Sequence, residues 1–98
     1  MSKKLVRDKI PEIIKEGGRI PITHIADDKE YFQELKEKLK EEVDEFLKAE
    51  NEHELADIFE VIKAICKFKN IKNLEETRKK KEKERGGFKK RIILDNIK

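Results

Sequence analysis

Two stretches with helical hydrophobic periodicity stand almost end to end in the middle of this chain, and they constrain the fold most strongly. In residues 29–49 the apolar side chains recur three and four positions apart, and residues 52–69 repeat that spacing. The break between them is the polar run Glu50-Asn51-Glu52. A connection this short makes neighbouring helices antiparallel. The sequence therefore predicts a central antiparallel helical hairpin.

Shorter helices are expected on both sides of this hairpin. Residues 7–16 have a helical pattern in which Pro11 suits the first turn and Gly17 begins a stop signal. After the hairpin, Asn73 can cap a further helix over residues 74–84. The pattern as a whole is typical of an all-α fold, a small helical bundle.

Two apolar stretches lie outside the helical pattern. Residues 20–25 and residues 91–94 are expected to be short extended segments. No linker composition divides the chain, so residues 1–98 are expected to form a single domain. The core of a domain this small is limited, and oligomerisation is the expected remedy.

The cysteine content and the absence of long apolar runs indicate a compartment. Cys66 is the single cysteine and lies on an apolar helix face, which favours a buried thiol in a reducing cytoplasm. No apolar run is long enough to span a membrane, and no signal-peptide pattern opens the chain. The sequence therefore predicts a cytoplasmic protein without a membrane partner.

Two groups of acidic residues lie in the helices of the predicted hairpin, and all of them except Glu41, which points further outward, fall on or beside the inward faces. Glu41, Glu42 and Glu45 belong to its first helix, and Glu54 and Asp57 belong to its second. Residues three apart project from nearly the same side of a helix, so each helix can aim two carboxylates at a common point. Four converging carboxylates repel strongly unless a cation lies between them. Because all candidate ligands are oxygen donors, Mg²⁺ is the expected ion, with Mn²⁺ as a substitute.

Each of these acids also has a purely structural explanation. Glu54 stands three residues after Asn51 and can complete an N-terminal capping box, while Glu41 and Glu45 can be ordinary exposed residues. The joint pattern of two inward acid pairs on two helices favours the metal site.

Charge is distributed unevenly along the chain. Residues 30–60 contain twelve acids against four lysines, whereas residues 78–91 contain nine basic residues against two acids. One interpretation is a metal site with a phosphate-binding arm. The other is that both runs are solvated helix faces of compensating sign.

The acidic pattern also resembles a known signature. Glu-Glu-x-x-Glu at residues 41–45, followed by Glu-x-x-Asp at residues 54–57, is similar to the motif of the all-α nucleoside triphosphate pyrophosphohydrolases. This MazG-like superfamily includes phosphoribosyl-ATP pyrophosphohydrolase and dimeric dUTPase. Residues 4–11 and residues 83–89 resemble a branch of short single-domain MazG-like proteins. The eight residues 46–53 between the two halves of the motif are fewer than larger relatives usually have.

The resemblance implies helical subunits that form a homodimer or homotetramer, with a nucleotide substrate bound near the bundle interface. It implies Mg²⁺-dependent hydrolysis between the α and β phosphates to a nucleoside monophosphate and pyrophosphate. The implied metal ligands are Glu42, Glu45, Glu54 and Asp57, and Glu41 would orient or deprotonate the attacking water. Basic side chains must hold the leaving pyrophosphate, and the candidates come from both ends of the chain: Arg7, Lys9, Lys83, Arg85 and Lys89.

Several functions stay open at this point. Within the enzyme hypothesis, house-cleaning of non-standard nucleotides competes with phosphoribosyl-ATP hydrolysis in histidine synthesis. A non-enzymatic module would bind nucleic acid through residues 78–91, but this tract has little aromatic interleaving and no reader motif, which disfavours nucleic acid as the partner. A purely structural helical protein would show no dependence of its stability on Mg²⁺.

Overall fold

The structure is a computed structural model that describes residues 3–98, and within that range it contains four helices and no strand. The predicted all-α class is therefore confirmed. The helices are α1 (Ile10–Glu16), α2 (Asp28–Ala49), α3 (Glu52–Phe68) and α4 (Leu74–Arg85).

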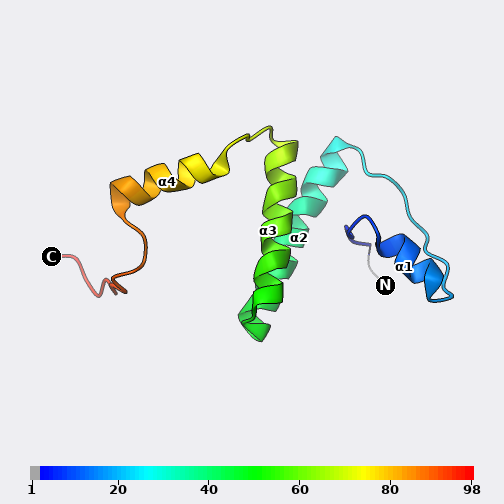
Figure 1. Ribbon diagram of the computed structural model, residues 1–98, viewed down its shortest axis with the longest axis horizontal. Coiled ribbons are helices and arrows are strands. Elements are labelled where there is room, and N and C mark those ends of the chain that lie inside the picture. The colour runs from blue at the N-terminus through cyan, green and yellow to red at the C-terminus, as the bar shows by residue number, and fades with distance from the viewer. Residues whose placement is uncertain (1–2) are drawn as a thin grey trace.

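The predicted antiparallel hairpin is the centre of the fold. Helices α2 and α3 run side by side along their lengths (Figure 1). The chain reverses at Glu50, which adopts the left-handed conformation with φ 54°, and its backbone N–H donates to the carbonyl of Phe46. Asn51 then starts α3, because its side-chain oxygen accepts the backbone N–H of Glu54 at 3.2 Å. These local bonds fix the tight turn that the short polar break predicts.

Side-chain caps also start the other hairpin helix and α4. Asp27 accepts the backbone N–H of Glu30 at 2.9 Å at the start of α2. Asn73 accepts the backbone N–H of Glu76 at 3.0 Å, and its amide donates back to the Glu76 carboxylate at 3.3 Å. Capping therefore sets the start of three of the four helices.

The core lies between α2 and α3. Leu35 of α2 is 1% exposed and Val61 of α3 is 8% exposed, and these two are the buried hydrophobic residues among residues 3–98. At the open end of the hairpin, Phe68 stacks on Phe32 with ring centroids 5.3 Å apart and meets the edge of Tyr31 at 5.5 Å. Aromatic packing at one end and the capped turn at the other therefore hold the two helices in register.

Helix α1 is shorter than the sequence predicts. It begins at Ile10 rather than at residue 7, and it ends as expected at Gly17. The reason is Pro11, which has no N–H. A helix that began at Arg7 would require residue 11 to donate to the Arg7 carbonyl, whereas in the structure Ile10 donates to that carbonyl at 3.0 Å. Residues 3–7 therefore lie outside the helix and have no regular structure.

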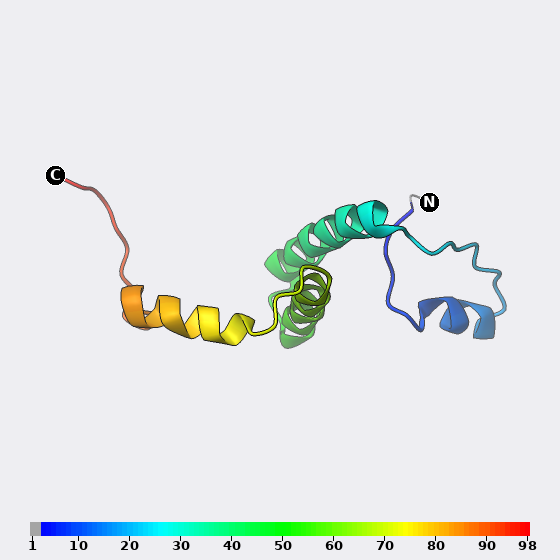
Figure 2. The same ribbon diagram turned by 90° about the horizontal axis from the view of Figure 1, so that it is seen from above.

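Helices α1 and α4 project from opposite sides of the hairpin (Figures 1 and 2). The molecule is 60 Å long, and its radius of gyration is 17.9 Å, against about 13 Å for a compact chain of this length. Residues 20–25 and 91–94, which were expected to be extended, belong to no helix or strand, and Arg91 is left-handed with φ 59°. Their apolar side chains are exposed. A single copy of the chain therefore buries little of its apolar surface.

Two structural features bear on the expected compartment: the burial of Cys66 and the apolarity of the helices. Cys66 carries a free thiol that is half-buried rather than buried. None of the helices in residues 3–98 has the length and apolarity that a membrane crossing requires.

Candidate metal centre

Three of the four predicted metal ligands come together in the hairpin. Glu42 from α2 and Glu54 and Asp57 from α3 each place one carboxylate oxygen within 4.8 Å of the other two. The acids meet because α2 ends and α3 begins at the same tight turn, and each helix carries its acids on the side that faces the other. These three carboxylates form one cluster, the acidic triad.

Glu42 is the buried member of the acidic triad. It is 6% exposed, and its Oε2 atom has no hydrogen-bond partner among residues 3–98. Burial raises the pKa of Glu42 above its ordinary value, and the neighbouring carboxyl groups of Glu45 and Asp57 raise it further, while Lys38 opposes them. An unpaired buried carboxylate oxygen is costly. It therefore indicates that a cation or a proton belongs at this position.

The other two acids of the first group lie outside the triad. Glu45 is exposed, close enough to Glu42 to raise its pKa. Glu41 accepts from Lys38 at 3.2 Å and from Lys4 at 3.4 Å. Burial raises the pKa of Glu41, but these two lysines outweigh it and hold the pKa below its ordinary value. Both acids line a separate depression of about 390 Å³ on α2.

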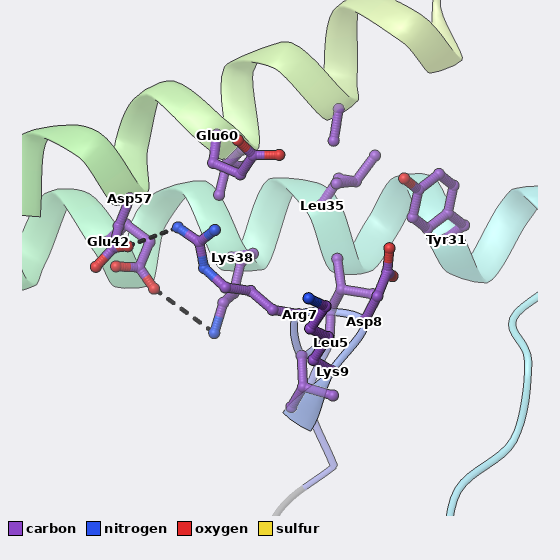
Figure 3. A pocket seen from close by; sticks show the side chains of 13 residues that line it. Leu5, Arg7, Asp8, Lys9, Tyr31, Leu35, Lys38, Glu42, Asp57 and Glu60 are labelled. Carbon is purple, nitrogen blue, oxygen red and sulfur yellow. Dashed lines mark hydrogen bonds and ion pairs between the residues drawn. The ribbon is translucent and has the colours of Figure 1, made fainter. Parts of the chain in front are cut away.

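Two cations of the chain itself approach the triad (Figure 3). The Arg7 guanidinium donates to Asp57 Oδ1 at 2.7 Å, across fifty residues of sequence. The Lys38 ammonium lies 3.6 Å from Glu42 Oε1. Arg7 and Lys38 thus partly neutralise the triad, and they leave Glu42 Oε2 without a partner.

A groove of about 420 Å³ opens beside the triad. Its volume falls in the range of small-molecule sites. Charged residues form one part of its wall, and apolar residues from the hairpin and from residues 5–6 form the rest. Figure 3 shows the guanidinium of Arg7 on the side of the triad, with Tyr31 and Leu35 further along. The groove lining includes Arg7, Lys9, Tyr31, Lys38, Glu42 and Asp57.

The predicted phosphate-binding residues divide into two sets. Arg7 and Lys9 line the groove beside the triad. Lys83, Arg85 and Lys89 are exposed on and after α4, which extends away from the hairpin (Figure 1). Within one chain, the structure therefore does not bring this second set to the carboxylates.

The acidic triad fits a hard divalent cation. All three donors are carboxylate oxygens, which Mg²⁺, Mn²⁺ and Ca²⁺ prefer. Two oxygens bound to the same Mg²⁺ are at most about 4.2 Å apart. A small side-chain rotation from the present spread of up to 4.8 Å is enough to reach that value.

Two residues near the site were missed by sequence reasoning. Lys38 is four residues before Glu42 and three before Glu41, and this helical spacing is a signal that could have identified it. Lys4 reaches Glu41 from a segment without regular structure, so no periodic pattern points to it.

Comparison with known proteins adds one partial relative. A protein of Mycolicibacterium smegmatis, described as an uncharacterized protein, is 47% identical over 47 residues, which is 48% of this chain and 48% of that protein. The chain thus spans about half the length of the relative it matches. No family model and no solved structure matches the chain.

Proposed function

We propose that this chain hydrolyses a nucleoside triphosphate between its α and β phosphates, with Mg²⁺ held by the hairpin carboxylates. The observation that carries the proposal is the acidic triad with its buried, unpaired Glu42 oxygen. The resemblance of residues 41–45 and 54–57 to the MazG-like signature agrees with this chemistry. A nucleoside monophosphate and pyrophosphate are the expected products.

Each part of the site has a role in this proposal. Glu42, Glu54 and Asp57 would hold the ion, and Glu45 would complete the set from its position beside Glu42. Bound Mg²⁺ would offset the phosphate charge and lower the pKa of an attacking water. Glu41 would have to leave its two lysine partners before it could orient that water.

The charged wall of the groove can accept a polyphosphate substrate once a cation is bound. A triphosphate carries about four negative charges, which carboxylates alone would repel. Arg7, Lys9 and Lys38 bring three positive charges to the groove, against the four acids Asp8, Glu42, Asp57 and Glu60, so bound Mg²⁺ would have to supply the positive excess. The apolar part of the wall, which includes Tyr31, offers a surface for a base. Non-standard nucleotides are the proposed substrates, and phosphoribosyl-ATP is the alternative.

The test is a panel of nucleotides incubated with the protein and Mg²⁺, with pyrophosphate and orthophosphate measured separately. Pyrophosphate release from at least one nucleotide is expected, and it should disappear in Glu42→Gln and in Asp57→Asn while the helical content stays unchanged. Glu37→Gln is the matched control, because Glu37 is an exposed acid of the same helix outside the triad. Orthophosphate as the product, or full activity of Glu42→Gln, would contradict the proposal.

We also propose that the active protein is a homodimer or homotetramer. On the hairpin, Phe59 is 72% exposed, and Leu47 and Leu55 are exposed as well. Large apolar side chains that stay exposed on a packed hairpin support an interface with another copy. Light scattering of the purified protein should show more than one copy, and Phe59→Asp should lower the mass. A monomeric wild type would exclude this assembly.

A second candidate function uses the other end of the molecule. Helix α4 stands apart from the hairpin, and its lysines at positions 79–81 are exposed. Such a helix could bind nucleic acid through phosphate contacts. Its Arg78, however, is already paired with Glu75 and Glu82. Salt-sensitive binding of a labelled oligonucleotide that survives Asp57→Asn would favour this function over the enzyme.

A further inference from the structure

Arg7 and Lys38 both approach the acidic triad, but they are held very differently. The Lys38 side chain is 16% exposed and belongs to the long helix α2. The Arg7 side chain is 54% exposed and comes from residues 3–7, which precede α1 and have no regular structure. Its ion pair with Asp57 is the one it makes among residues 3–98. Arg7 is therefore the cation that can leave the triad at small cost to the fold.

The position of Arg7 overlaps with that of the cation the triad fits. Its Nη2 atom is 2.7 Å from Asp57 Oδ1, and Asp57 is one of the three converging carboxylates. A divalent cation on the triad would repel a guanidinium held against the same carboxylate. The same guanidinium lines the groove, where an entering phosphate would offer it a bidentate, oppositely charged partner.

We infer that Arg7 and the divalent cation exchange on Asp57, and that the guanidinium released by the cation becomes the ligand of the phosphate chain in the groove. This inference rests on the proposed function and adds an order of events to it. Arg7 neutralises the triad in the metal-free protein and binds substrate in the metal-loaded protein. The cation and the polyphosphate thereby strengthen each other's binding through one side chain.

The exchange predicts effects of opposite sign from a single substitution. Arg7→Gln removes the competitor of the cation, so the cation should bind more tightly. The same change removes a phosphate ligand, so the polyphosphate should bind more weakly. A merely structural Arg7 would weaken both, because the N-terminal segment would detach and the groove would lose that wall.

The first measurement is the affinity for Mn²⁺ alone, from the loss of the free-ion signal in electron paramagnetic resonance. Arg7→Gln should bind Mn²⁺ about two- to fivefold more tightly than the wild type, the worth of an exposed ion pair. Lys3→Ala is the control, because Lys3 ties the same segment to Glu30 at 2.7 Å without touching the triad. It should leave the Mn²⁺ affinity unchanged. Unchanged or weaker Mn²⁺ binding in Arg7→Gln would overturn the exchange.

The second measurement is calorimetric titration with inorganic triphosphate at a fixed, saturating Mg²⁺ concentration in both solutions. Arg7→Gln should bind the triphosphate about tenfold more weakly, since a hydrogen-bonded charge pair is lost. Equal affinity would overturn the role of Arg7 as a phosphate ligand. Circular dichroism melting of each variant checks that the fold is intact.

The two proposals fail in different ways. If the wild type binds no Mn²⁺, the metal site is wrong and the exchange falls with it. If the wild type binds Mn²⁺ and releases pyrophosphate, but Arg7→Gln shows no gain in Mn²⁺ affinity, the exchange alone is wrong.

Discussion

Replacement of Glu42 by glutamine should stabilise the metal-free protein and abolish its response to Mg²⁺. Glu42 is 6% exposed, and its Oε2 atom lacks a hydrogen-bond partner among the described residues. A buried unsatisfied polar atom costs about 1–3 kcal/mol. Glutamine has nearly the same shape, carries no charge and brings an N–H₂ group that can donate to the neighbouring carboxylates. We expect a gain of about 1–2 kcal/mol at neutral pH in the presence of EDTA.

The gain has a characteristic pH dependence. Burial first, and then the carboxyl groups of Glu45 and Asp57, raise the pKa of Glu42 in the folded chain. Protonation of Glu42 therefore stabilises the fold. This contribution is complete below the ordinary value of 4.5 and is lost as pH rises through the raised pKa. The advantage of glutamine should shrink as pH falls through the raised pKa of Glu42 and should be absent below 4.5.

Thermal melting monitored by circular dichroism gives the measurement. For a domain of this size, about 1 kcal/mol corresponds to about 4–8 °C in Tm. In EDTA at pH 7.5, Glu42→Gln should melt at least about 4 °C above the wild type. With Mg²⁺ at a hundred times its Kd, the wild type gains about 2.7 kcal/mol, so the order of the two proteins should reverse.

Two results would refute this reasoning. If Glu42→Gln melts at or below the wild type in EDTA, the buried carboxylate is satisfied in a way the geometry does not show. If the variant keeps the Mg²⁺-induced rise, the triad is not the cation site. Glu37→Gln, an exposed acid on α2, should change neither quantity beyond about 0.5 kcal/mol.

Further predictions concern the elements that position the site. Asn51→Ala should lower the stability of the hairpin by about 1 kcal/mol, seen as a lower Tm, because α3 loses its N-cap. Asn73→Ala removes an equivalent cap from α4, which stands apart from the hairpin. This variant should lose helicity without a shift of the main melting transition. Equal Tm shifts in Asn51→Ala and Asn73→Ala would contradict this expectation. Leu35→Ala should cost about 2–5 kcal/mol of the free energy of unfolding, measured by urea titration, whereas Ile22→Ala should be nearly neutral, because Leu35 is buried and Ile22 is exposed.

The parts of the structure that follow local rules were predictable from the sequence. Asp27, Asn51 and Asn73 cap the three helices that follow them, because capping needs a short polar side chain and one backbone N–H. The antiparallel hairpin follows from the length of the turn between α2 and α3. The start predicted for α1 at residue 7 is wrong, because Pro11 has no N–H to donate to the Arg7 carbonyl and therefore falls in the first turn of a helix that starts at Ile10.

The parts that depend on the path of the chain were not predictable. Of the four predicted ligands, Glu45 lies beside the triad rather than in it, because a step of three residues turns a helix by about 300° and leaves Glu45 on the exposed side of Glu42. Glu54 and Asp57 are also three residues apart, but both reach the triad, because α2 lies between the directions in which the two side chains leave α3. The pairing of Arg7 with Asp57 spans fifty residues, and no periodicity encodes it.

The two-residue reversal at Glu50 and Asn51 has a consequence for chains built on the same hairpin. The turn fixes which side of each helix a given residue occupies. One residue inserted into α3 ahead of Glu54 would therefore rotate Glu54 and Asp57 by about 100° away from Glu42. The acids of α3 would face Glu42 again only after an insertion of whole helical turns. They would lie level with Glu42 along the helix axis only if α2 were lengthened by the same amount. The interval between the two acidic groups is therefore restricted to discrete lengths.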